Sequence, residues 1–151
     1  MRSLNELLAA VGVKTSYDEE TLLKINTKRF SVGEELGNFM LDRRQLVYAG
    51  RYLGKTRREF LPSSILLDEL SRVEGLNRIH VDADIAWLFV CGRDIFGENV
   101  RSAEGEFADG NAFLVMFGGS CLGYGVVEPF EGRLILRNVL DIGDFLRREK
   151  K

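Results

Sequence analysis

The chain has 151 residues, 45% of them hydrophobic and 29% charged, and its net charge at pH 7 is −2. These values are typical of a globular protein with one medium domain or two small ones. We expect no membrane span and no signal peptide, because no apolar run approaches about 20 residues and the N-terminus lacks a cleavage pattern. The acidic balance means that binding to nucleic acid would need a local cluster of basic residues.

The first half of the sequence predicts a mixture of helices and strands. Ser3 and Glu6 form the S-x-x-E pattern of a capping box, and apolar residues at helical spacing follow as far as Gly12. A hairpin is predicted between residues 21–26 and 29–32. The other elements predicted here are a helix at 34–41, a strand at 46–53, a charged turn at 55–59, and a helix that Ser63 or Ser64 caps and Gly75 ends.

After Gly75 the pattern changes to short strands. Strands are predicted at residues 78–81, 85–91, 112–117, 122–127 and 133–136, with turns at 82–84, 108–111, 118–120 and 131–132. Short strands separated by glycine-rich turns are typical of a small β-barrel. The chain then predicts a short helix that Asp141 caps and that ends in basic residues. No linker composition separates the two halves, so we expect them to pack directly on each other.

Two stretches of the chain resemble a known combination of domains. Residues 118–127 and 138–148 resemble the PUA module, a small β-barrel of pseudouridine synthases and archaeosine transglycosylases. Residues 46–62, LVYAGRYLGKTRREFLP, and the helix after them look like the pre-PUA domain of a ribosome biogenesis factor, and residues 79–92 and the turn at 105–110 also fit. From about residue 22 onward the chain is similar to the archaeal and eukaryotic large-subunit biogenesis factors that pair these two domains.

This resemblance implies an α+β fold, with an α/β pre-PUA-like domain at residues 1–78 packed on a PUA-like mixed β-barrel at residues 79–151. It also implies a non-catalytic protein without a cofactor, which binds U-rich RNA or pre-rRNA and assists rRNA processing and large ribosomal subunit biogenesis. The implied partners are ribosome assembly or RNA-processing proteins, and we expect a monomer that binds no membrane. The compact chain is more similar to archaeal members, which implies a cytoplasmic protein, or a nucleolar one if the source is eukaryotic.

The predicted RNA site lies in the last part of the chain. In the family that it resembles, basic residues at the C-terminal end of the PUA domain contact RNA, and Arg147, Arg148, Lys150 and Lys151 occupy that end here. We add Arg137, Gly123 and Gly125, because glycines permit a close approach of RNA to the backbone. Each glycine taken alone is explained more simply by strand and turn geometry, and Arg147 and Arg148 also suit the C-terminal end of a helix dipole.

A second basic cluster runs from Arg43 to Arg58 and is interleaved with Tyr48, Tyr52 and Phe60. A tyrosine beside an arginine can stack on a base, but Tyr48 and Tyr52 would share one strand face, which favours packing against a helix. The charges then form a solvated face or a protein-docking surface. The alternative function is therefore a protein–protein adaptor in ribosome assembly or RNA decay, with incidental RNA contact.

The sequence argues against an enzyme and against a metal site. His80 is the one histidine, so Ser120 and Cys121 have no second histidine to complete a nucleophile–base pair. Asp82 and Asp84 could form a carboxylate pair, although a turn explains them more simply. No zinc-ligand spacing and no catalytic aspartate motif of a pseudouridine synthase is present. The two cysteines, Cys91 and Cys121, are expected to be reduced and buried, with a disulfide as the alternative.

Overall fold

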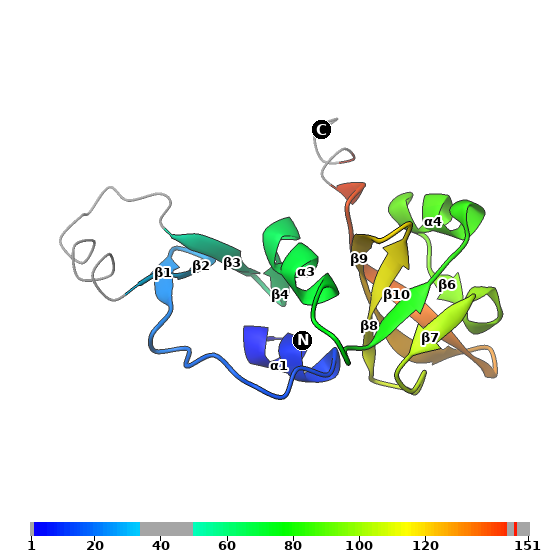
Figure 1. Ribbon diagram of the computed structural model, residues 1–151, viewed down its shortest axis with the longest axis horizontal. Helices are drawn as coiled ribbons and strands as arrows, with labels where there is room; N and C mark the ends of the chain where they lie inside the picture. The colour runs from blue at the N-terminus through cyan, green and yellow to red at the C-terminus, as the bar shows by residue number, and fades with distance from the viewer. Residues whose placement is uncertain (1, 34–49, 145–146, 148–151) are drawn as a thin grey trace.

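The computed structural model describes residues 2–33, 50–144 and 147, which form two sheets with helices packed against them (Figure 1). The first part of the chain forms α1 (Leu4–Ala10), β1 (Leu23–Ile25), β2 (Lys28–Ser31), β3 (Arg51–Thr56), β4 (Phe60–Pro62) and α3 (Ser64–Ser71). The second part forms β5 (Arg78–His80), α4 (Ala83–Val90), β6 (Ile95–Phe96), a 3-10 helix (Gly97–Asn99), β7 (Ser102–Glu104), β8 (Ala112–Phe117), β9 (Ser120–Phe130) and β10 (Arg133–Asp141). None of the helices among these residues is long and apolar enough to cross a membrane.

Both helices of the first half begin at the serine caps that the sequence predicts. The Ser3 hydroxyl accepts a hydrogen bond from the Glu6 backbone N–H at 3.2 Å, and the Ser63 hydroxyl accepts one from the Leu66 N–H at 3.1 Å. Each hydroxyl satisfies a backbone donor that the first turn of a helix leaves without a partner. The capping box is half complete, because the Glu6 carboxylate accepts from the Arg2 N–H instead of the Ser3 N–H.

The strands β1 to β4 form a four-stranded sheet in chain order. The predicted hairpin is confirmed, because β1 and β2 are antiparallel and the turn between them places Asn26 at a φ of 53°. The strand predicted at 46–53 is displaced: β3 continues through Thr56, so Lys55 belongs to the strand and not to the charged turn. The predicted helix at 34–41 and the part of that strand at 46–49 lie outside the described residues.

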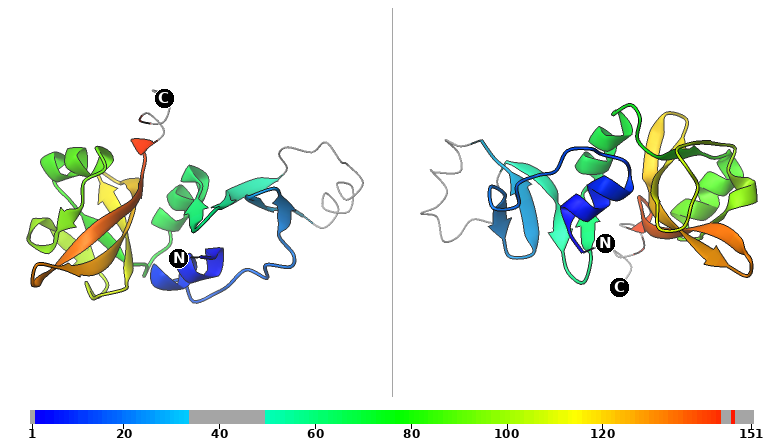
Figure 2. Two further views of the ribbon diagram at one scale, coloured as in Figure 1. Left: turned by 180° about the vertical axis from the view of Figure 1, so that it is seen from behind. Right: turned by 90° about the horizontal axis from the view of Figure 1, so that it is seen from below.

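The second half forms a six-stranded mixed sheet of order β6-β10-β9-β8-β5-β7, which curls into a half-barrel (Figure 2). Only the β5–β8 pair among these strands is parallel, and the other neighbours are antiparallel. The predicted strand at 112–117 is confirmed with its bounds, whereas β9 and β10 extend beyond the predicted ranges. The sequence did not predict β6 or β7, which contribute only two and three residues.

The strand predicted at residues 85–91 is wrong, because this segment forms α4. Asp82 has an extended backbone and begins the helix, so the predicted turn at 82–84 is its N-terminal end. The buried residues Ala86 and Phe89 are three positions apart, which suits a helix, while Trp87 is 68% exposed. A short apolar run fits either a strand or a helix, and periodicity alone does not separate them. Cys91, which ends α4, is exposed and not buried as predicted.

The residues of β8 alternate between two hydrophobic clusters. Ala112, Leu114 and Met116 pack against α1 and α3 of the first half, whereas Phe113 and Val115 pack with α4 inside the curled sheet. Alternation with period two is what a strand buried on both faces requires. One of the two cores is therefore shared by both halves of the chain, and α3 lies between the two sheets (Figure 1).

Asn77 connects the two halves by hydrogen bonds at the point where the chain passes from one half to the other. Its backbone N–H donates to Val11 O at 2.8 Å, and its Nδ2 donates to Ala10 O at 3.1 Å and to Ala112 O at 3.2 Å. Its own carbonyl accepts from the Leu114 N–H at 3.0 Å. One residue thus joins the end of α1 to the central strand of the second sheet.

Candidate RNA-binding site

A buried carboxylate organises the C-terminal end of β10. Asp141 is only 2% exposed, and both of its oxygens accept hydrogen bonds from Arg147, at 3.0 Å from Nη1 and 2.7 Å from Nη2. Asn138 Nδ2 donates a third bond at 3.1 Å. Hydrogen bonding to Asp141 raises the pKa of the Arg147 guanidinium above its ordinary value, although burial opposes the shift. A bidentate arginine–carboxylate pair of this kind fixes the position of both side chains.

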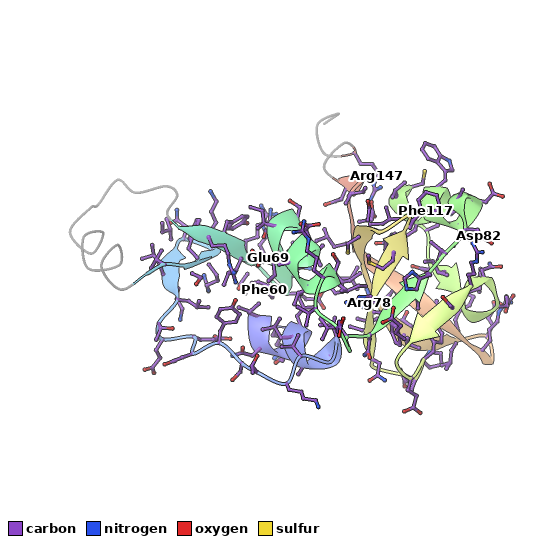
Figure 3. All side chains as sticks on the ribbon, viewed as in Figure 1. Phe60, Glu69, Arg78, Asp82, Phe117 and Arg147 are labelled. Carbon is purple, nitrogen blue, oxygen red and sulfur yellow. The ribbon has the colours of Figure 1, made fainter. Side chains whose placement is uncertain are left out.

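Arg147 and Asn138 also bind the C-terminal end of α4, and Figure 3 shows Arg147 beside this helix. Arg147 Nη1 donates to Val90 O, and Asn138 Nδ2 donates to Phe89 O at 2.8 Å. A cation at this end of a helix also interacts favourably with the helix dipole. The prediction that Asp141 caps a helix is wrong: it is the last residue of β10, and its carboxylate binds Arg147.

The two predicted glycines lie in the same region but are buried between strands. Gly123 is the register partner of Asp141, has a φ of +145°, and a Cβ there would lie 2.0 Å from Leu140 O. At Gly125 a Cβ would lie 2.5 Å from Arg137 O. Both positions need glycine because β9 and β10 approach closely. The structure therefore explains these glycines by strand packing, and it brings Gly123 next to the Asp141–Arg147 pair.

The remaining predicted site residues are not all gathered at this point. Arg137 lies on β10, where its Nε donates to Glu128 Oε2 at 3.0 Å across the strand pair. Arg148, Lys150 and Lys151 lie outside the described residues. RNA contact by any of the seven predicted residues stays a prediction, and for Arg147 the structure adds an anchoring role.

Sequence reasoning missed Asn138 and Trp87. Asn138 links Asp141, Phe89 O and, through its own N–H, Asp94 Oδ1 at 2.8 Å. A β-bulge between Asn138 and Leu140 was not visible in the residue pattern, and this bulge disturbs the alternation of the strand. The sequence predicts a strand at Trp87, but this residue lies on α4, where its ring is exposed to solvent.

Two of the residues considered for catalysis, Asp82 and His80, have ionic partners. Asp82 forms an exposed ion pair with Arg101 at 3.3 Å, while Glu104 binds both His80 Nε2 and Arg78 Nη1 at 3.0 Å. Burial raises the pKa of the Cys121 thiol to about 11, which disfavours the reactive thiolate. In the part of the chain that the structure describes, no three His, Cys, Asp or Glu side chains come close enough to hold a metal ion.

The part of the chain that forms the curled sheet matches a known protein family. Residues 77–150 match the family model described as UPF0113 PUA domain. A protein of Aeropyrum pernix named UPF0113 protein is 35% identical over 103 residues, which cover 66% of this chain and 57% of that protein. The aligned region thus spans little more than half the length of this archaeal relative. The PUA part of the sequence resemblance is confirmed, and the second half of this chain is similar to the PUA domain of the UPF0113 family.

Proposed function

We propose that this protein is a non-catalytic RNA-binding protein that assists rRNA processing and large ribosomal subunit biogenesis. The observation that carries the proposal is the match of residues 77–150 to a PUA domain, a module that generally binds RNA. The similarity to a UPF0113 protein of an archaeon supports the proposal that this protein is of the archaeal kind. Under this proposal the first half is a pre-PUA domain, the ligand is U-rich RNA or pre-rRNA, and the protein acts as a monomer with ribosome assembly or RNA-processing proteins.

The anchoring role of Arg147 refines which residues would bind phosphate. Its guanidinium holds the buried Asp141 carboxylate and Val90 O, so replacing it would alter the structure as well as any RNA contact. Arg148, Lys150 and Lys151 are therefore the better probes of the proposed tail site. Contacts of lysine and arginine with phosphates make binding dependent on salt and largely independent of sequence.

The test is a fluorescence anisotropy titration of labelled oligouridylate with the full chain. The variant R148E/K150E/K151E should lower affinity at least about tenfold at about 50 mM salt and reduce the slope of log K against log salt by about 2, since each contact with a single strand contributes about 0.7. The control variant K14E/R72E/R101E carries the same change of charge at exposed positions elsewhere and should bind nearly as the unchanged chain does.

Unchanged affinity and slope in the tail variant would contradict this placement of the site. No binding of the unchanged chain to oligouridylate or to pre-rRNA fragments, at any salt concentration, would contradict the proposed function itself. A ribosome assembly protein that co-purifies with such a chain would then favour the adaptor.

A further inference from the structure

The sheet of the first half carries an unusual excess of cations. Its strands and the tip of the β3–β4 hairpin contain one acidic residue, Glu59, among residues 23–25, 28–31 and 51–62. The basic residues in the same ranges are Lys24, Lys28, Arg29, Arg51, Lys55, Arg57 and Arg58. Because the whole chain has a net charge of −2, this sheet is a strongly asymmetric part of the molecule.

Two of these cation pairs lie directly opposite each other in neighbouring strands. Lys28 of β2 is the register partner of Lys55 of β3, and Lys24 of β1 is the partner of Arg29 of β2. Like charges in directly opposed positions repel each other. The same positive charges attract a polyanionic ligand.

One of these pairs belongs to a row of residues that leads to the hairpin tip. Lys55 is also the register partner of Leu61 in β4, so Lys28, Lys55 and Leu61 share one face of the sheet. Leu61 lines an open hollow together with Arg57, Arg58 and Glu59. Both arginines are exposed, and the hydrogen bond from the Arg57 N–H to Glu59 O closes the tip on which they stand.

The same face continues into a small pocket between the two halves of the chain. The pocket has a volume of about 190 Å³, and its walls are Tyr52, Lys55, Leu61, Pro62, Ser63, Ser64, Ile65, Leu140 and Asp144. Sites for drug-sized ligands measure about 300–1,000 Å³, so this pocket fits a single flat ring. Its walls are mostly apolar, and the Ser64 hydroxyl supplies a polar group that suits a base edge.

We infer that this face is a second RNA-binding surface, which holds the phosphates of a single-stranded segment along Lys28, Lys55, Arg57 and Arg58 and takes one base into the pocket. The inference rests on the proposed function and extends it from the PUA domain to the other half of the chain. A single strand is the fitting ligand because only an unpaired base can enter a pocket of this size. An acidic peptide would be attracted by the same cations, but its carboxylate side chains carry no flat ring that would fill the pocket.

The phosphate part of the inference is tested in the same anisotropy assay with the full chain. The variant R57E/R58E should weaken binding of oligouridylate roughly tenfold and lower the salt slope by about 1.4, the value for two lost contacts with a single strand. The control R72E/R101E makes the same change of charge at two exposed arginines away from this face. Thermal unfolding of both variants checks that each is folded.

The base pocket is tested at Ser64, which lines the pocket and leaves the Ser63 cap in place. Ser64→Phe fills the pocket and should weaken binding at least about fivefold, because a stacked base is lost. Ser64→Ala removes only the hydroxyl and should weaken binding by only about twofold. If the tail variant loses affinity while R57E/R58E binds like its control and S64F binds like S64A, the proposed function stands and this inference is wrong. If the unchanged chain binds no RNA, both fall together.

Discussion

Removal of the Arg147 guanidinium should destabilise the fold well beyond the tail that this residue belongs to. The Asp141 carboxylate is 2% exposed in the unchanged chain. In Arg147→Ala it keeps only the bond from Asn138, while Val90 O loses the Arg147 donor. Breaking a fully buried ion pair costs about 3–5 kcal/mol. Because the Arg147 side chain is 41% exposed, water screens part of the interaction, and we expect a loss of about 1–3 kcal/mol.

Urea unfolding followed by tryptophan fluorescence measures this loss, since the one tryptophan, Trp87, lies on α4. With a slope of about 1–3 kcal/mol/M, the midpoint should fall by roughly 1 M. Arg147→Lys keeps the charge but loses the bidentate geometry, so its urea midpoint should lie between those of R147A and the unchanged chain. The double variant D141N/R147A should be more stable than the sum of the single variants predicts, because the neutral amide needs no cation.

A loss below about 0.5 kcal/mol in R147A, or strictly additive effects of D141N and R147A, would refute the anchoring role. In that case Arg147 would be an ordinary surface cation, and its replacement would become a clean test of RNA contact.

Two further predictions concern the second half of the chain. Gly123→Ala should lower the free energy of unfolding by about 3 kcal/mol or more, because its Cβ would lie 2.0 Å from Leu140 O. Gly119→Ala, which has open space around it, should lower it by only about 1–2 kcal/mol, because of its positive φ. Equal losses in urea unfolding would contradict the close packing of β9 and β10. The hydrogen bond from His80, and then the charge of Arg78, lower the pKa of Glu104 below its ordinary value of 4.5. A carboxylate with a lowered pKa stabilises the fold at neutral pH and loses this contribution as the pH falls below 4.5, so Glu104→Gln should cost about 0.2–1 kcal/mol at pH 7 and converge with the unchanged chain in acid. If the stability difference between Glu104→Gln and the unchanged chain grew toward low pH, this prediction would be contradicted.

The sequence predicted elements whose signal is local. The serine caps at Ser3 and Ser63 are read from a few neighbouring residues, and the turn at Gly118 and Gly119 needs the positive φ that both glycines have. The strand prediction at residues 85–91 was wrong because a run made only of apolar residues shows neither helical nor strand spacing. Such a run arises when both faces of an element are buried, or when an apolar side chain is exposed to solvent. Trp87 is such a case, since its exposed ring made the run look more buried than it is.

The candidate site was harder to predict because it depends on contacts between distant positions. Arg147 meets Val90 across 57 residues and Asn138 meets Phe89 across 49, so no local pattern announces either contact. The glycines at 123 and 125 were recognised as places of close approach, but the approaching group is the backbone of β10. The pocket beside Lys55 could not be predicted either, because its walls come from both halves of the chain.

The core shared between α1, α3 and the outer face of β8 has a consequence for the architecture of the whole chain. A fragment beginning at residue 79 would lose Asn77 and would leave Ala112, Leu114 and Tyr124 without the helices that cover them. Such a fragment would expose an apolar sheet face and would be prone to self-association. The second half resembles a separate module, but it shares a hydrophobic core with the first half. Recombining it with other domains would therefore require a new cover for that face.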